Sequence, residues 1–238
     1  MTWREIIYMC SDELKLSSDD SYYTEDHIKF LISKYRSFLL KQRYSDIKKF
    51  IPESNFSTIC LDLMEVPAIS GEPCEGGVYL RTTKKVPFMM GIKQPRVYPV
   101  DYYQGEITYI SRDRMKYVGF NKYLSNIIYC SLAPDNYIYF KSSNPQYLYL
   151  EKVRITALFS DAEETFGLQC DEDGQICELL DSDFPLESAL VPPLVELVVK
   201  ELRGPEYSPE DKVNDANDNL SNVSTKQWKV MKVSEIDY

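Results

Sequence analysis

The segment that decides the fold class is Ser57-Thr58-Ile59-Cys60-Leu61-Asp62-Leu63, because the hydrophobic period of the chain changes there. Ile59, Leu61 and Leu63 are separated by single, less apolar residues, and this alternation is typical of a strand with one buried face. The two-residue period returns further along the chain. It predicts additional strands at residues 78–82, 106–111, 127–132, 137–141 and 147–159.

Clusters of turn-forming residues at 133–136 and 142–145 separate the last three predicted strands. Because Pro, Asn, Asp and Ser favour tight turns, these three strands are expected to form an antiparallel meander. Three prolines and two glycines interrupt residues 84–105, so a long irregular loop is predicted there. Loops of that length are uncommon in compact domains and often contact partners.

Residues before the strands have a helical period. Apolar residues from Trp3 to Leu14 predict one helix, and a second begins near Thr24. The second predicted helix has apolar residues at three- and four-residue spacing, namely Ile28, Leu31, Ile32, Tyr35, Phe38 and Leu39. A polar run at 17–21 separates the two helices, which are expected to form an antiparallel hairpin that ends at Pro52.

Helical patterning returns after residue 188. Pro192-Pro193 lies in the first turn of one predicted helix and Gly204 is placed to end it, while Ser208-Pro209 begins another. The chain is therefore predicted to be α+β. Its N- and C-terminal helices are expected to form a helical body around a central antiparallel β-rich insert. The predicted divisions are N-terminal helices 1–56, β-rich insert 57–160, acidic connector 161–187, C-terminal helices 188–224 and extended docking tail 225–238.

Composition excludes several functional classes. The 238 residues carry a formal charge of −10, which repels phosphate at long range and disfavours general nucleic-acid binding. Apolar runs are only a few residues long, so no membrane span is predicted. The N-terminus lacks the pattern of a secretory signal, and no Cys-x-x-Cys motif occurs. The six cysteines are therefore expected to be small buried apolar residues of a protein in a reducing compartment, rather than disulfide, redox or metal-binding groups.

No motif of catalysis or cofactor binding is present. The chain has neither a phosphate-binding glycine loop nor a nucleophile elbow, and His27 is its single histidine. Residues 169–180 resemble a calcium loop, but Gln169 and Leu180 occupy positions that need carboxylates. We therefore assign no catalytic, cofactor or metal residues and expect a non-enzymatic protein. A structural cation beside the Asn/Asp-rich segment after residue 213 is left open.

Charge is distributed unevenly along the chain. Residues 81–122 contain nine Lys and Arg against three acidic residues, whereas residues 161–187 contain ten acidic residues and no Lys or Arg. Two opposite faces of this kind can order subunits, because complementary patches raise association rates and specificity. Two independently solvated faces are the alternative.

A helical stretch at 189–202 is followed by Tyr207-Ser208-Pro209-Glu210-Asp211 and then by an Asn/Asp-rich segment. This order resembles the C-terminal part of virion proteins from crAss-like tailed phages of gut Bacteroidetes. The turn at 133–136 and the strand at 153–159 are similar to the β part of the same proteins. The resemblance covers residues 125–224 well. The helix–β–helix order also resembles head–tail connector, or adaptor, subunits of short-tailed phages.

The resemblance implies a structural virion protein of the neck, assembled in the host cytoplasm. It implies a dodecameric ring that joins the portal to the tail, contacts adjacent neck or tail proteins and lets packaged DNA pass without specific binding. Another tail component, such as a hub or tube subunit, is the alternative, and a non-virion phage protein ranks last. The expected interface residues are Trp228, Val230, Val233 and Tyr238 in the tail, and Lys84, Lys85, Lys93 and Arg96 in the basic stretch.

Overall fold

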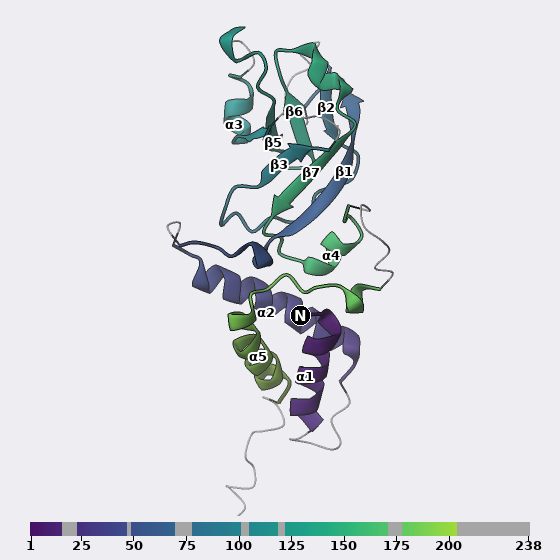
Figure 1. Cartoon of the computed structure of the whole chain (residues 1–238), viewed down its shortest axis with the longest axis vertical. Coiled ribbons are helices and arrows are strands. Elements are labelled where there is room, and N and C mark those ends of the chain that lie inside the picture. Colours follow the sequence, from purple (N-terminus) through teal and green to yellow (C-terminus); the bar gives the residue numbers. More distant parts are fainter. Residues whose placement is uncertain are drawn as a thin grey trace, which may run out of the picture. The chain divides into compact units, whose positions relative to one another are not determined.

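The computed structural model describes residues 1–15, 23–46, 49–69, 78–100, 105–118, 122–170 and 178–203 (Figure 1). The chain divides into two compact units, Met1–Val198 and Val199–Tyr238. All helices and strands before α5 belong to the first unit. The described part of the second unit is the end of α5, from Val199 to Arg203.

Helix α1 (Trp3–Lys15) begins with a reciprocal cap. The Glu5 N–H donates to Thr2 Oγ1 at 3.3 Å, and the Thr2 N–H donates to the Glu5 carboxylate at 2.8 Å. These two bonds satisfy backbone donors that the first helical turn leaves unpaired. The helix buries the face that the sequence predicts: Trp3, Ile6, Ile7, Cys10 and Leu14.

Helix α2 (Glu25–Arg43) is capped by Thr24, whose hydroxyl accepts a hydrogen bond from the His27 N–H. Both predicted N-terminal helices are thus confirmed. Figure 1 shows α2 crossing α1 obliquely, so the predicted antiparallel hairpin is wrong. Phe38 was expected in the buried stripe of α2 but is exposed, because the stripe turns towards the positions of Arg36 and Leu40 instead.

Seven strands form one sheet, in the order β3-β7-β1-β2-β6-β5-β4. Their bounds are β1 Ser57–Val66, β2 Tyr79–Thr82, β3 Arg96–Pro99, β4 Thr108–Tyr109, β5 Tyr129–Leu132, β6 Ile138–Lys141 and β7 Lys152–Ala157. A bridge between Val97 and Ile107 joins the two ends of this order, with the Ile107 N–H donating to the Val97 carbonyl at 2.7 Å. We call the result the closed sheet.

The long strand β1 belongs to both halves of the closed sheet. Its residues 57–62 pair with β7 and its residues 63–66 pair with β2, both antiparallel. The alternation quoted at the start of the sequence therefore places Ile59 and Leu61 inside. They join a core to which the other strands contribute, including Leu80, Val97, Ile107, Cys130, Ile138, Phe140, Val153, Ile155 and Phe159.

Three features of the β region differ from the sequence-based expectation. The predicted loop 84–105 contains β3, and its residue Met89 bridges to Phe159, so much of the stretch is hydrogen-bonded to the sheet. The predicted meander is confirmed for its first pair, since β5 and β6 are antiparallel neighbours, and wrong for its last strand, because β7 pairs with β1 and β3 instead of β6. The insert is also not wholly antiparallel, since β4 and β5 are parallel. These pairings are long-range, and local turn signals do not encode them.

Short helices connect the strands and follow them. They are η1 Glu53–Asn55, α3 Arg112–Met115, η2 Lys122–Leu124, η3 Pro145–Tyr149, α4 Ala162–Phe166, η4 Leu179–Asp181 and η5 Ser188–Leu190. η3 occupies the start of the strand predicted at 147–159. The Asn144 side chain caps this helix by accepting a hydrogen bond from the Gln146 N–H. The mixed α+β class is confirmed.

Helix α5 (Val191–Arg203) carries the double proline in its first turn, as predicted. The second C-terminal helix and the tail at 225–238 lie outside the described residues. The five-part division of the chain and the helical body remain predictions.

Cys60 and Cys170 form a disulfide with their Cα atoms 5.0 Å apart. The expectation that all cysteines are small buried apolar residues is therefore wrong for this pair. The structural reason is that residues 168–170 lie along β1, where the Cys60 N–H donates to the Leu168 carbonyl at 2.8 Å. Cys10 and Cys130 are free and buried as expected. Cys74 and Cys177 lie outside the described residues.

Candidate assembly surfaces

A buried arginine holds the first unit together. The Arg36 side chain is completely buried and donates to three carbonyls, those of Pro185 at 2.8 Å, Phe159 at 2.7 Å and Asn55 at 3.1 Å. Burial lowers the pKa of Arg36 to about 10, while Asp161 acts in the opposite direction. The side chain therefore stays charged at neutral pH and joins α2 to three distant segments. Sequence reasoning missed it because an arginine within an apolar helix stripe looks like a solvent-exposed residue.

The segment 178–187, which we call the acidic strap, is bound to the helices by its carboxylates. On one side Arg4 of α1 pairs with Asp181 at 2.9 Å and with Glu178 at 3.3 Å. On the other side Glu187 pairs with Arg43 at 2.9 Å and accepts a hydrogen bond from Tyr44 at 2.8 Å. Several of the carboxylates expected to form an acidic docking face thus bind residues of their own chain.

The predicted basic residues separate into two groups. Lys93 and Arg96 lie over the ring of Phe56, at 5.5 and 5.1 Å from its centroid, and Arg96 also pairs with Glu53. That pairing lowers the pKa of Glu53. Lys84 and Lys85 are exposed beside Val86, whose N–H donates to the Asn136 carbonyl in the β5–β6 turn. No described contact brings the two lysines to Lys93 or Arg96.

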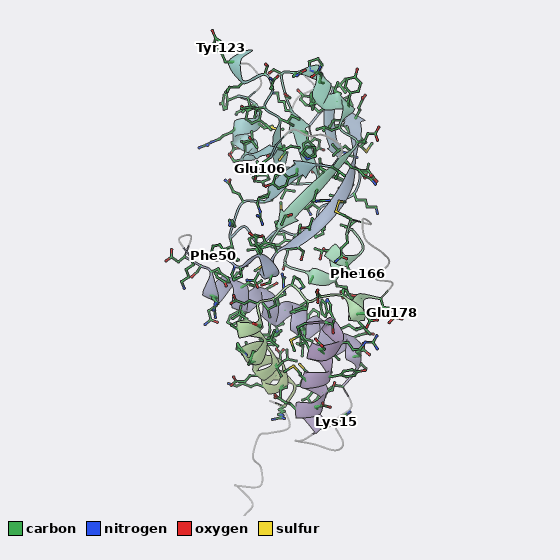
Figure 2. The ribbon with its side chains drawn as sticks, viewed as in Figure 1. Lys15, Phe50, Glu106, Tyr123, Phe166 and Glu178 are labelled. Atoms are coloured by element: carbon green, nitrogen blue, oxygen red, sulfur yellow. A yellow bond between two sulfur atoms is a disulfide. The ribbon has the colours of Figure 1, made fainter. Side chains whose placement is uncertain are left out.

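A groove of about 1040 Å³ lies beside Lys93 and Arg96. Its walls are residues 49–51, residues 91–96 and residues 106–109. Phe50 stands at this groove with 79% of its surface exposed, and Figure 2 shows it projecting away from the ribbon. Basic and acidic side chains are mixed around the groove, with Lys49 and Lys93 near Asp46 and Glu106. The groove therefore shows no preference for a ligand of one charge.

Exposed aromatic residues also occur on both long N-terminal helices. Phe30 and Phe38 of α2 are 65% and 53% exposed. On α1, Tyr8 is 58% exposed and Met9 lies next to it. Surface helices normally present polar residues on the side opposite their buried stripe, so exposed aromatic residues at these positions mark candidate contact surfaces. The predicted buried stripes leave out Tyr8, Met9 and Phe30, and they wrongly include Phe38.

Further exposed tyrosines lie in or next to the short helices that connect the strands of the closed sheet. Tyr117 follows α3, Tyr123 lies in η2 and Tyr149 lies in η3. Figure 2 shows Tyr123 at the tip of a loop, pointing outwards. Large exposed aromatic side chains are enriched at protein interfaces, so these three are further candidates for contacts with other proteins.

The thiols and carboxylates of the described residues show no reactive arrangement. Burial raises the pKa of Cys10 to about 12 and also raises the pKa of Cys130, which keeps both thiols protonated. Among residues with a described placement, no three His, Cys, Asp or Glu side chains gather where they could hold a metal. None of the helices described here is long and apolar enough to cross a membrane.

Comparison with known proteins agrees with a structural role. Residues 5–220 match the model of a protein family described as phage tail ring protein 2. The chain is also similar to Ring protein 2 of Bacteroides phage crAss001, with 70% identity over 221 residues, covering 92% of this chain and 98% of that protein. The match with the family model ends before the tail at 225–238. The resemblance to crAss-like virion proteins is therefore confirmed, and the chain belongs to the ring protein 2 family of crAss-like phage tails.

Proposed function

We propose that this chain is a ring subunit of the phage neck that joins the portal to the tail and surrounds part of the DNA channel. The observation that carries the proposal is its membership of a family of phage ring proteins. The subunit acts by assembly and performs no catalytic step. We further propose a dodecameric ring, a location in the virion neck and assembly in the host cytoplasm.

Two structural features support an assembly role. The first unit is firmly tied together by Arg36 and the acidic strap, so a subunit can present fixed surfaces to its neighbours. Its exposed aromatic residues lie on several elements, including α1, α2 and the short helices of the closed sheet. A subunit in the middle of a stack needs contacts of this kind with lateral neighbours and with the layers on either side.

We propose that the tail residues Trp228, Val230, Val233 and Tyr238 dock on the adjacent layer, and that Lys84, Lys85, Lys93 and Arg96 contribute to contacts with a neighbouring protein. Lys93 and Arg96 are the better supported pair, because they lie at the groove beside the exposed Phe50. The net charge of −10 suits a channel protein, since phosphate repulsion lets DNA slide without adhering.

An image of the virion in which this chain is located by its density tests the proposal. We expect closed rings of this chain directly below the portal. Absence of the chain from purified virions would refute the structural role. Rings located further down the tail would support the alternative, a tail hub or tube component.

Truncation tests the docking of the tail. Deleting residues 225–238 should leave a folded subunit that no longer attaches to the adjacent layer. Normal attachment of the truncated chain would show that the tail is not the docking element. The variant with Lys93 and Arg96 both replaced by Ala tests the contact at the groove, and the variant with Lys84 and Lys85 both replaced by Ala tests the other basic site in the same way.

A further inference from the structure

Helices α1 and α2 carry two exposed faces of opposite charge. We propose that the α1 face of one subunit packs against the α2 face of the next copy, so that these two helices form the lateral contact of the ring. The proposal rests on the proposed ring assembly and adds to it the residues that meet.

The α2 face consists of residues at three- and four-residue spacing on the side opposite the buried stripe: His27, Phe30, Lys34, Phe38 and Lys41. All five are exposed, and the two aromatic rings alternate with basic side chains along the helix. Lys34 lies 5.1 Å from the ring centroid of Tyr35, which holds its charge close to the helix surface. This face is apolar and basic.

The α1 face is formed in the same way by Glu5, Tyr8, Met9, Asp12 and Glu13. It also lies opposite the buried stripe of its helix, and it holds three carboxylates around Tyr8 and Met9, with the exposed Lys15 on the same side in the last turn, so that its net charge is negative. The acidic strap lies beside α1 and adds Glu178, Asp181 and Asp183, although Arg4 and the N-terminal amine neutralise part of their charge. This face is apolar and acidic.

The two faces fit the requirement of a closed ring. A head-to-tail contact uses two different surfaces of each subunit, and it closes when the same contact repeats around an axis. An apolar pair at the centre of each face supplies burial, and opposite charges around it supply orientation and exclude the pairing of like faces. A two-fold contact of α2 with α2 would instead bring basic residues together.

The proposal identifies a different basic face from the one that charge counts suggest. The stretch 81–122 holds more Lys and Arg than α2, but its described members are divided between the closed sheet and the groove, and Arg81 stacks on Tyr137 at 4.3 Å. On α2 two lysines, Lys34 and Lys41, share one side of one rigid element with the exposed Phe30 and Phe38, whereas Arg36 is buried and Arg43 pairs with Glu187. Concentration on a single face, rather than the total count, favours α2.

Cross-linking of engineered cysteines tests the contact. The parent chain has Cys74 and Cys177 replaced by Ser, and the rings are assembled together with the portal and neck proteins of the phage. One copy carries Tyr8→Cys, another carries Phe38→Cys, and a short bismaleimide links thiols that are close. We expect linked dimers from the mixture and none from either variant alone. A chain that carries both substitutions should give a ladder of linked copies.

The control pairs Tyr8→Cys with Tyr123→Cys, which is more exposed than Phe38 but lies in η2, away from α2 in the chain. We expect no links from that mixture. Rings that form normally but give no link between Tyr8→Cys and Phe38→Cys would overturn the proposed contact and leave the proposed function standing. Links from Phe38→Cys to another neck protein, or between two Phe38→Cys copies, would overturn it as well. Failure of the parent chain to form rings with its neck partners would overturn both.

Charge reversal provides a second test on folded variants. Lys34→Glu together with Lys41→Glu should lower the yield of rings about tenfold, because attraction between the faces becomes repulsion. Asp12→Lys with Glu13→Lys in the same chain should restore the yield, and circular dichroism of each variant should match the parent. An unchanged yield in the α2 variant, or no rescue in the combined variant, would contradict the contact.

Discussion

The replacement of Arg36 by Met tests the interpretation that one buried cation organises the first unit. Methionine fills a similar volume but donates no hydrogen bond, so the carbonyls of Asn55, Phe159 and Pro185 lose the donor that they share. An unsatisfied buried carbonyl costs about 2 kcal/mol, which gives a loss of about 6 kcal/mol for three. Part of this loss is offset, because the variant no longer has to bury a charge.

The lowered pKa of Arg36 indicates the size of that offset. Its fall to about 10, the net result of burial and of the opposing charge of Asp161, corresponds to roughly 3 kcal/mol against the charged form. The expected net change is therefore a loss of about 3 kcal/mol in the free energy of unfolding, a large fraction of the ~5–15 kcal/mol typical of a folded domain. At a urea dependence of about 3 kcal/mol per molar, the midpoint should fall by about 1 M.

Urea unfolding followed by tryptophan fluorescence is the assay. Trp3 is buried against Phe184 of the acidic strap, with ring centroids 4.6 Å apart, so its emission reports the strap directly. Trp228→Phe in the background leaves Trp3 as the single tryptophan. Lys41→Met, at an exposed position of the same helix, is the control and should change stability by less than about 0.5 kcal/mol. Equal midpoints for Arg36→Met and the parent would refute the organising role.

The pH dependence of the Arg36 effect has a definite sign. The folded-state pKa of about 10 lies below the unfolded value, so the unfolded chain binds more protons only between pH 10 and that higher value, and the contribution of this group to stability rises with pH in that window. Below pH 10 both states are protonated. The difference between Arg36→Met and the parent should therefore be constant from pH 6 to pH 9, and a slope in that range would contradict the assignment.

Three further predictions concern other contacts. Replacing both Cys60 and Cys170 by Ser should lower the oxidised protein's stability by about 2–4 kcal/mol, and the urea midpoints of parent and variant should converge when a reductant is added. The Arg96 pair lowers the pKa of Glu53 in the folded state, so it stabilises the fold above the unfolded pKa of 4.5, and this stability is lost as the pH falls through the lower folded-state pKa. Glu53→Gln should remove this contribution. Urea midpoints at pH 7 and pH 3 measure this effect, which should stay below about 1 kcal/mol because the pair is exposed. Tyr147→Phe should lower the free energy of unfolding by about 1 kcal/mol, because the Tyr147 hydroxyl donates to the Val78 carbonyl at 2.8 Å. Burial raises the pKa of Tyr147 to about 12, so in a pH titration of the parent its phenolate absorbance should develop only near pH 12, and the variant should lack that contribution.

Local patterns in the sequence predict the elements better than they predict the partners of those elements. The spacing of Trp3, Ile6, Cys10 and Leu14 correctly predicts the buried face of α1. The alternation after Ser57 correctly predicts β1. Both signals lie within a few residues, where the period of the backbone controls which side chains share a face.

Pairing across the closed sheet could not be predicted in the same way. β1 pairs with a strand about a hundred residues away, and nothing in either local pattern specifies that choice over the nearer β6. Strand β3 was not predicted, because it ends at Pro99. Proline disfavours a central strand but is tolerated at the end of a sheet.

The candidate surfaces divide in a similar manner. The basic residues Lys84, Lys85, Lys93 and Arg96 were found from charge counts, yet only the structure shows that the last two lie together at a groove. Phe38 was placed among the core residues, because an apolar residue near the edge of a helical stripe fits both a buried and an exposed role. Arg36 gave the opposite error, since charge normally indicates exposure.

The bridge between Val97 and Ile107 has a consequence for the way copies gather. Sheets with unpaired edges recruit further strands without limit, which is a hazard for any protein concentrated at one place in many copies. Here the backbone groups at both ends of the strand order are engaged with each other. Growth by strand addition is thereby suppressed. The number of subunits in an assembly is then set by the geometry of its side-chain contacts.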